Sequence, residues 1–230
     1  MFGEFQIIGH RGWTGKYPEN TLLGFSKAID VGATMIEFDV QITKDNHLAV
    51  FHDETTKRLC DKNINISSST RKEIKELSVD GQEIPFLDDI FYDLQDNIKY
   101  YIELKTFPKT TTDQRTKLAF YAVNEIMKHR LNQNCVIVGF DPNLLHLCKR
   151  LGFNNLGQNL NHEEKPYFCK LACRNHTSIK APVTEPTFAW TVNNARRMKT
   201  LLNNNVSGIV TDHVDRLVEV YKKHGKLTTV

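Results

Sequence analysis

The sequence predicts an α/β fold, a TIM (β/α)₈ barrel with a small insertion after the third strand. Short apolar runs alternate with stretches of helical spacing, which is the pattern of parallel strands joined by helices. Eight such runs can be found, the number that closes a barrel. The 230 residues suit one barrel and contain no internal repeat or Pro/Gly linker. We therefore expect a single domain over 1–230.

The expected strands are short apolar runs, each followed by polar or turn residues. They occupy 5–9, 35–42, 48–51, 99–104, 135–140, 155–160, 188–192 and 208–211. The expected helices occupy 20–31, 86–95, 113–131, 142–151, 194–204 and 213–224. The first helix has Asn20 and Thr21 as its cap and ends at Gly32, which supports its boundaries.

The connection between the second and third strands is too short for a crossover helix. Only "TKDNH" at 43–47 joins them, so a hairpin-like extension or an abrupt turn must come between them. Asn46 suits such a turn because asparagine adopts left-handed conformations more readily than most residues. The polar segment 54–84 follows, with a short helix expected around 70–77, and we interpret it as a small insertion above the barrel mouth.

The region 161–187 gives the weakest pattern. A barrel requires one helical crossover here, but only 163–174 could be helical. Pro182 and Pro186 exclude a regular helix directly before the strand that starts at 188. Either the barrel is thin on this side or residues are missing from the chain.

The composition excludes several classes of protein. With 40% hydrophobic and 25% charged residues, the chain has the balance of an ordinary globular protein. A net charge of +3 without a basic cluster argues against a nucleic-acid partner. Five cysteines without a CxxC pair argue against a disulfide framework or structural zinc and favour reduced thiols. No signal sequence or transmembrane segment is visible, so we expect a cytoplasmic protein.

Acidic residues repeat at the ends of two expected strands. Glu37 and Asp39 are two residues apart and share a strand face, as do Glu103 and Lys105. In one barrel the three carboxylates would converge near the mouth. Oxygen ligands without a nearby cysteine suit a hard divalent cation, Mg²⁺ or Ca²⁺. The alternative is a set of structural ion pairs with Lys105 and Arg11, but the repeated spacing favours the metal.

Two histidines follow strands in the same half of the chain. His10 ends "IIGH" and His52 ends "LAVFH", next to the acidic set. A single histidine after a strand is usually an ordinary polar residue, but two on neighbouring strand ends suit general acid/base catalysis. Arg11 and Lys105 would complete a cradle for a phosphate. Metal, acid/base pair and phosphate clamp together indicate cleavage of a phosphodiester.

A set of short motifs runs in one order along nearly the whole chain. They are "GHRG" at 9–12, "PENT" at 18–21, "IEFDVQITKD" at 36–45, "HDE" at 52–54, "IPFLDDI" at 84–90, "IELK" at 102–105, "WTVN" at 190–193 and "GIVTD" at 208–212. In these motifs the sequence resembles the glycerophosphodiester phosphodiesterases. The resemblance implies a (β/α)₈ barrel with a small insertion after the third strand. It also implies hydrolysis of glycerophosphodiesters to sn-glycerol 3-phosphate and an alcohol, with Mg²⁺ or Ca²⁺.

The resemblance also implies a role for each candidate residue. The acid/base pair would be His10 and His52, the metal ligands Glu37, Asp39 and Glu103, the phosphate contacts Arg11 and Lys105, and the wall of the glycerol pocket Trp190. It leaves open whether the adjacent glycerol hydroxyl or a water is the nucleophile. After "HDE" the family commonly continues with an "LDRTT"-like run, whereas this chain has "TTKRLCDKN", which leaves open how the insertion contacts the alcohol group.

Two other functions are alternatives to this one. A lysophospholipase D-like or phospholipase C-like activity on lipid phosphodiesters would need an apolar rim, for which the insertion region offers only Ile64, Ile66 and Phe86. A catalytically silent binding barrel would be signalled by loss of a histidine or a carboxylate, and all are present. The preferred alcohol, the ion and the oligomeric state are left open.

Overall fold

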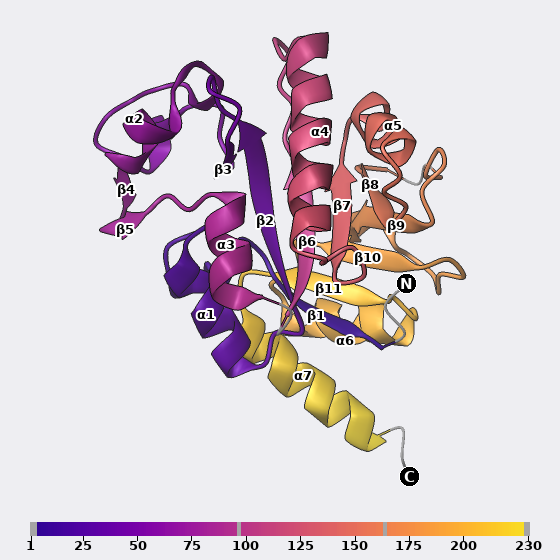
Figure 1. The fold of residues 1–230 in the computed structure, drawn as a ribbon. Coiled ribbons are helices and arrows are strands. Elements are labelled where there is room, and N and C mark those ends of the chain that lie inside the picture. The colour runs from indigo at the N-terminus through magenta and orange to yellow at the C-terminus, as the bar shows by residue number, and fades with distance from the viewer. Residues whose placement is uncertain (1–3, 96–97, 163–164, 228–230) are drawn as a thin grey trace.

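Eight parallel strands close into a barrel in the computed structural model of this protein, which describes residues 4–95, 98–162 and 165–227 (Figure 1). In order around the barrel they are β1 (Gln6–Gly9), β2 (Met35–Ile42), β6 (Lys99–Leu104), β7 (Cys135–Gly139), β8 (Leu156–Leu160), β9 (Leu171–Asn175), β10 (Thr187–Trp190) and β11 (Gly208–Thr211). Strand β1 pairs with both β11 and β2, which closes the ring. The predicted barrel is confirmed.

One of the eight predicted strands is not a barrel strand. β3 (Leu48–Val50) pairs antiparallel with the end of β2, with Val50 opposite Val40. The five residues of the connection therefore form a hairpin turn, in which Asn46 has a φ of 65°. An antiparallel partner can follow so short a turn, whereas a parallel one cannot.

The missing barrel strand lies in the region for which a helix was the only regular structure expected. Residues 171–175 form β9, between β8 and β10, and residues 165–170 have no regular structure. The possible helix at 163–174 is therefore wrong for 165–174, and 163–164 lie outside the described residues. Leu171 and Cys173 face the barrel interior. The strand has only five residues and ends in the polar residues Arg174 and Asn175. So short an alternation of apolar and polar side chains does not distinguish a strand from a helix in the sequence.

Helices cover most of the outside of the barrel. They are α1 (Leu22–Val31), α3 (Leu87–Leu94), α4 (Thr112–Lys128), α5 (Pro142–Arg150), α6 (Ala195–Asn203) and α7 (Val214–Leu227). The Thr21 side chain caps α1 by accepting the Gly24 N–H, and Gly32 ends this helix with a φ of 110°. Between β8 and β10, a 3₁₀ turn, η3 (His176–Ser178), is the only helical structure among the described residues. None of the described helices is both long and apolar enough to span a membrane.

The segment after β3 lies beside the end of β2, as Figure 1 shows at the upper left. Its elements are η1 (Thr56–Arg58), η2 (Ile66–Ser68), α2 (Arg71–Lys75), β4 (Ser78–Val79) and β5 (Gln82–Glu83). It has an apolar cluster of its own, in which Ile66, Ile74 and Phe86 are fully buried against Ala49 of β3. A capping box between Thr70 and Glu73 starts α2. We refer to residues 54–84 as the insertion.

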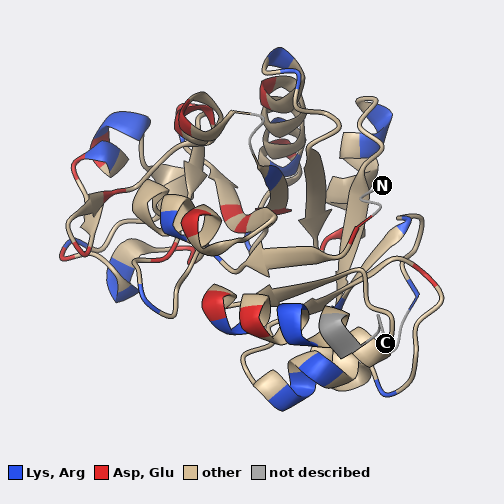
Figure 2. Cartoon of the chain, turned by 90° about the horizontal axis from the view of Figure 1, so that it is seen from below, with Lys and Arg blue, Asp and Glu red and all other residues tan. Residues whose placement is uncertain are grey.

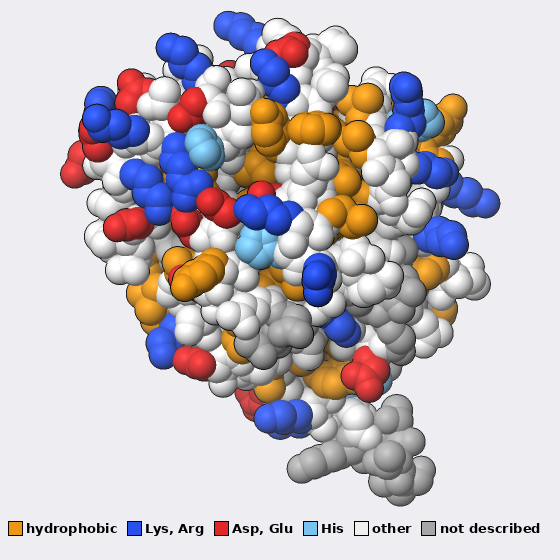
Figure 3. Space-filling model, viewed as in Figure 1, with side chains coloured by type: hydrophobic (Ala, Val, Ile, Leu, Met, Phe, Trp, Pro, Cys, Tyr) orange, Lys and Arg blue, Asp and Glu red, His pale blue; other side chains and the backbone are white. Residues whose placement is uncertain are grey.

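Charged residues lie mostly on the outer helices and loops, and the barrel strands carry few of them (Figure 2). On the face shown in Figure 3, basic and acidic side chains are interspersed. The charged residues on the barrel strands are Glu37, Asp39, Lys99, Glu103 and Arg174. Buried strand charges are costly unless they are paired or bind an ion. Three of the five, Glu37, Asp39 and Glu103, are acids on the neighbouring strands β2 and β6, which points to this part of the barrel as the place where function is concentrated.

Strand β2 separates the helix-covered core from the barrel interior. Ile36, Phe38 and Val40 belong to the core between strands and helices, where the Phe38 ring lies 5.5 Å from Phe25 and 6.3 Å from Tyr100. Because successive side chains point to opposite faces of a strand, Glu37 and Asp39 face the barrel interior.

Replacing Phe38 with alanine should therefore weaken the whole barrel. The ring is fully buried, and loss of such a side chain costs about 3–5 kcal/mol of unfolding free energy. Urea denaturation would measure this, with Phe120→Ala as the control, because that ring on α4 is 45% exposed and its removal should cost about 0.5 kcal/mol or less. Equal losses for the two variants would contradict the assignment of Phe38 to the core.

Candidate active site

One cleft at the barrel mouth collects all of the candidate residues. Its volume is about 210 Å³, and it lies at the ends of β1, β2, β6 and β10 and beyond the end of β3. The candidate residues that line it are His10, Arg11, Glu37, Asp39, His52, Glu103, Lys105 and Trp190. The structure thus brings together every residue singled out in the sequence. It adds five further lining residues, which are Tyr101, Phe140, Asn159, Thr191 and Val210.

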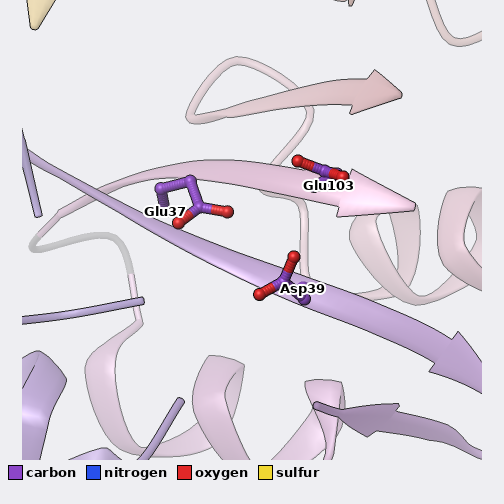
Figure 4. Close-up of side chains that lie close together, drawn as sticks. All are labelled: Glu37, Asp39 and Glu103. Atoms are coloured by element: carbon purple, nitrogen blue, oxygen red, sulfur yellow. The ribbon is translucent and has the colours of Figure 1, made fainter. Parts of the chain in front are cut away.

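The three carboxylates lie side by side on two neighbouring strands. Asp39 of β2 is directly opposite Glu103 of β6 in the parallel register. Figure 4 shows Glu37 and Asp39 on one strand and Glu103 on its neighbour, and one oxygen from each lies within 4.8 Å of the others. Glu37 and Asp39 are 3% and 2% exposed. Burial raises the pKa of Glu37 to about 8, and the nearby charges of Asp39 and Glu103 add to this effect.

Two cations at the ends of the strands compensate part of this charge. Lys105 Nζ lies 2.8 Å from Glu103 Oε1 and 3.4 Å from Asp39 Oδ1. Arg11 Nε lies 3.3 Å from Asp39 Oδ2, and the Arg11 backbone N–H donates to Glu37 Oε2 at 2.8 Å. Burial opposes ionisation of Asp39, but Lys105 and Arg11 outweigh it and lower the pKa of this carboxyl. The ion pairs considered as an alternative to a metal are therefore present around the same carboxylates.

The loop that carries His10 and Arg11 is fixed by close packing. Gly12 has a φ of 91°, and a Cβ at this position would lie 2.8 Å from the backbone carbon of Gly24. Only glycine combines that conformation with so close an approach. The loop therefore rests directly on the first turn of α1, which sets the direction of the two side chains.

A carboxylate orients His10. His10 Nδ1 lies 2.6 Å from Asp212 Oδ1, at the end of β11. Asp212 also accepts hydrogen bonds from Thr14 at 2.8 Å and from Asn193 at 2.5 Å. A proton on Nδ1 shared with the carboxylate leaves Nε2 for a ligand in the cleft. Burial favours the neutral ring, but the hydrogen bond to Asp212 and the charge of Glu37 outweigh it and raise the pKa of His10.

A second carboxylate orients His52 in the same way. His52 Nδ1 lies 2.6 Å from Asp53 Oδ1. Asp53 also accepts hydrogen bonds from Arg58 of the insertion, and these bonds, followed by the one from His52, lower the pKa of Asp53 to about 2. Both histidines therefore stand in a carboxylate–imidazole pair, although His10 is held by the barrel and His52 by the hairpin.

Amide and phenol groups orient Asp39 and Glu103 by hydrogen bonds. Asn20 Nδ2 donates to Asp39 Oδ2 at 3.0 Å. Asn159 Nδ2 donates to Glu103 Oε2 at 2.9 Å, and the Tyr101 hydroxyl donates to Asn159 Oδ1 at 2.9 Å. Each carboxylate therefore keeps one direction without occupying all of its oxygen lone pairs.

An aromatic wall lies on the other side of the cleft. Trp190 Nε1 donates to the carbonyl of Cys173 at 2.8 Å, so its polar group is satisfied by the barrel. Its ring meets Phe140 edge to face at 5.8 Å. Phe140 is 45% exposed. The wall offers apolar surface to a ligand held by the charged groups opposite.

The sequence did not reveal what the supporting residues do in the site. Asn20 was expected only as part of the cap of the first helix, whereas Thr21 caps α1 and Asn20 binds Asp39. Asn20, Asp53 and Asp212 lie within "PENT", "HDE" and "GIVTD", so a signal was present without an indication of their partners. Tyr101 shares a strand face with Glu103, which is a weaker signal. Asn159 carried no signal, because its partner Glu103 lies 56 residues away in the chain.

Comparison with known proteins gives a consistent set of relatives. The model of the "Glycerophosphoryl diester phosphodiesterase family" matches residues 10–167. A glycerophosphodiester phosphodiesterase from Caldanaerobacter subterraneus subsp. tengcongensis is 28% identical, over 95% of this chain and 98% of that protein. A glycerophosphodiester phosphodiesterase from Bacillus altitudinis is 27% identical, over 94% of this chain and 97% of that protein.

Solved structures share the fold. A glycerophosphodiester phosphodiesterase from Thermotoga maritima has a TM-score of 0.78 and 26% identity, over 95% of this chain and 100% of that chain. A phosphodiesterase from Oleispira antarctica, in complex with the product sn-glycerol-3-phosphate, has a TM-score of 0.83 and 19% identity, over 94% and 96%.

The pairing of His10 with Asp212 can be tested by titration. Because the carboxylate stabilises the protonated ring, the NMR titration midpoint of His10 should lie above its ordinary value of 6.5 and should fall in Asp212→Asn. The stabilisation that this pair gives to the fold should be complete below pH 6.5 and should be lost as the pH rises through the raised pKa. Thr14→Val, which removes only a neutral hydrogen bond to Asp212, should move the midpoint less. An unchanged midpoint in Asp212→Asn would contradict the pairing.

Proposed function

Because the chain belongs to the glycerophosphoryl diester phosphodiesterase family, we propose that the cleft is its active site, with His10 and His52 as the acid/base pair. The protein is a phosphoric diester hydrolase that converts glycerophosphodiesters to sn-glycerol 3-phosphate and an alcohol. The observation that supports the site assignment most strongly is that three carboxylates and two carboxylate-bound histidines line one cleft.

Glu37, Asp39 and Glu103 are proposed to hold a divalent cation. Three carboxylates within 4.8 Å of one another offer only oxygen donors, which suit Mg²⁺ or Ca²⁺. Burial raises the pKa of Glu37, and repulsion from Asp39 and Glu103 adds to this effect; a cation between the acids would relieve that repulsion. When bound, the cation would polarise a phosphoryl oxygen and offset negative charge.

The side chains of the cleft account for binding of the phosphate. Arg11 is proposed to bind phosphate oxygens through its guanidinium group and Lys105 as a point charge. The glycerol carbons would rest on the ring of Trp190, whose Nε1 is already bonded to the backbone. The Oleispira antarctica relative binds sn-glycerol-3-phosphate, and the same ligand suits the charged and aromatic walls of this cleft.

The two histidines divide the proton transfers. His52, held by Asp53 at Nδ1, would accept the proton of the nucleophile at Nε2. A water as nucleophile would give glycerol 3-phosphate directly, whereas a glycerol hydroxyl would give a cyclic phosphate, which a water would then open to glycerol 3-phosphate by breaking one of the two ring P–O bonds. His10, whose pKa is raised, would donate its Nε2 proton to the alcohol oxygen as the bond from that oxygen to phosphorus breaks. Asp212 would stabilise the protonated form of His10 before this transfer.

The lipid-directed alternative loses most of its expected rim. Ile66 and Phe86 are fully buried in the cluster of the insertion, so they cannot contact an acyl chain, and Ile64 is half-buried against the same cluster. Phe140 remains as an exposed apolar side chain beside Trp190. We therefore propose a glycerophosphodiester with a polar alcohol as the substrate. A panel of glycerophosphodiesters and lysolipids would test this, and faster cleavage of the lysolipids would overturn it.

A reducing compartment such as the cytoplasm is proposed as the place of action. All five cysteines are free thiols. Burial raises the pKa of Cys148 to about 12, and the pKa values of Cys135 and Cys173 are raised by burial as well. Such thiols are inert packing groups, as expected where disulfides do not form.

Removal of either histidine should abolish most activity without unfolding the protein. His10→Ala and His52→Ala should each lower kcat by about 10²- to 10⁴-fold, the range for loss of one positioned acid or base. Release of glycerol 3-phosphate in a coupled assay would measure this. His47→Ala is the matched control, because its imidazole lies outside the cleft, in the β2–β3 turn. Unchanged rates in both active-site variants would refute the assignment.

Removal of divalent cations should stop the reaction. Excess chelator is expected to abolish activity, and added Mg²⁺ or Ca²⁺ to restore it. Calorimetry gives a readout independent of turnover: cation binding should be lost in Glu103→Gln and retained in Glu83→Gln, whose side chain is 77% exposed on the insertion. Full activity after exhaustive chelation would rule the cation out.

A further inference from the structure

One arginine of the insertion joins two carboxylates next to the cleft. Arg58 Nη1 and Nη2 donate to the two oxygens of Glu19, both at 2.8 Å. Arg58 Nε donates to Asp53 Oδ2 at 2.7 Å, and Nη2 also donates to Asp53 Oδ1 at 3.2 Å. The planar guanidinium group thus uses two edges for two carboxylates, a geometry that only arginine offers.

Each of these carboxylates is bonded to a residue of the cleft. Glu19 Oε1 accepts from Arg11 Nη1 at 2.9 Å. Asp53 Oδ1 lies 2.6 Å from His52 Nδ1. The result is one continuous chain of bonds from Arg11 through Glu19, Arg58 and Asp53 to His52. Arg58 itself does not line the cleft.

We propose that Arg58 is a positioning residue that holds the phosphate-binding arginine and an acid/base histidine in register with each other. The inference rests on the roles proposed above for Arg11 and His52. Through it, the insertion would set the geometry of the reaction without contacting the reacting atoms.

The charges around Arg58 explain why the positions of both Arg11 and His52 depend on it. Without it, Glu19 would have Arg11 as its only cationic partner among the described residues and would draw that guanidinium away from the phosphate. Asp53 would lose its anchor and could turn away from His52. Two carboxylates that have each lost a cationic partner would also repel an anionic substrate more strongly. Burial opposes ionisation of Glu19, but bonds from Arg58 and the charge of Arg11 outweigh it and lower its pKa.

A purely structural role would be to fasten the insertion to the barrel, but other contacts already do this. The apolar cluster with Ala49 and Phe86 packs the insertion against β3. The backbone N–H of Lys44, in the β2–β3 turn, donates to the carbonyl of Ser69 in the insertion at 2.9 Å. The segment is therefore expected to stay in place when Arg58 is replaced.

The chain also supplies a matched control for the test. Arg71 of α2 is likewise in the insertion, and its guanidinium bridges Asp88 and Asp89 at 2.7 and 2.9 Å. It has the same chemistry and lies outside the cleft. Arg71→Ala should therefore change stability without changing kcat or KM.

The experiment compares steady-state kinetics of Arg58→Ala, Arg58→Lys, Glu19→Gln and Asp53→Asn with wild type and Arg71→Ala. Arg58→Ala should lower kcat/KM by about 10- to 100-fold, the range for residues that orient a functional group, through both parameters. Glu19→Gln should act mainly on KM and Asp53→Asn mainly on kcat. Arg58→Lys should restore one parameter at most, because a point charge reaches one carboxylate. A kcat/KM of Arg58→Ala within twofold of that of wild type, or a change in kcat/KM equal to that of Arg71→Ala, would overturn the proposal.

An NMR measurement separates this inference from the proposed function. The Nδ1–H proton of His52 should give a hydrogen-bonded signal in wild type and in Arg71→Ala, and should weaken or shift in Arg58→Ala. If wild type fails to cleave glycerophosphodiesters, the proposed function falls, while this signal still decides whether Arg58 holds His52. An identical signal in Arg58→Ala and wild type would overturn the positioning role.

Discussion

The barrel mouth is organised around one electrostatic constraint, the placement of three acids in a nearly dry space. The register of β2 and β6 puts Asp39 beside Glu103, and Glu37 follows two residues before Asp39 on the same face. Like charges so close are tolerated only with compensation. Arg11 and Lys105 give part of it, and a divalent cation would give the rest. The same cations that stabilise the acids are placed to meet a phosphate, so folding and substrate binding draw on the same charges.

Much of this was predictable because it depends on local pattern. The alternation in "MIEFDV" identified the apolar face of β2 and the acidic face opposite, and the short "TKDNH" connection predicted a hairpin-like extension or an abrupt turn, of which the hairpin is present. The pattern did not reveal that β3 stands outside the ring, since strand propensity says nothing about which neighbour a strand pairs with. Strand β9 was not predicted, because its five residues end in Arg174 and Asn175 and give too short an apolar run to be identified as a strand.

The supporting residues of the site were harder to predict, because their contacts depend on closure of the barrel. His10 and Asp212 are 202 residues apart and meet only because β1 pairs with β11. The pairing of His52 with Asp53 is local, yet the anchor of Asp53 comes from a turn of the insertion. Side chains at strand ends can be identified one by one in a sequence. The hydrogen bonds that give each of them a direction need the completed fold.

Helices cover the barrel unevenly. Strand β9 stands across the ring from β2, and around it the described residues contain no α-helix between β8 and β10. A loop covers this strand instead: Leu171, Ala172 and Cys173 are fully buried, and Ile179 packs into the same core as the outer helices. This side carries Trp190, which is bonded to the β9 carbonyl of Cys173, whereas the acids stand on β2 and β6. Surface loops accept insertions and substitutions more readily than the elements they connect. Sequence change in this loop can therefore reshape the wall that contacts the organic part of a substrate while the charged groups keep their spacing.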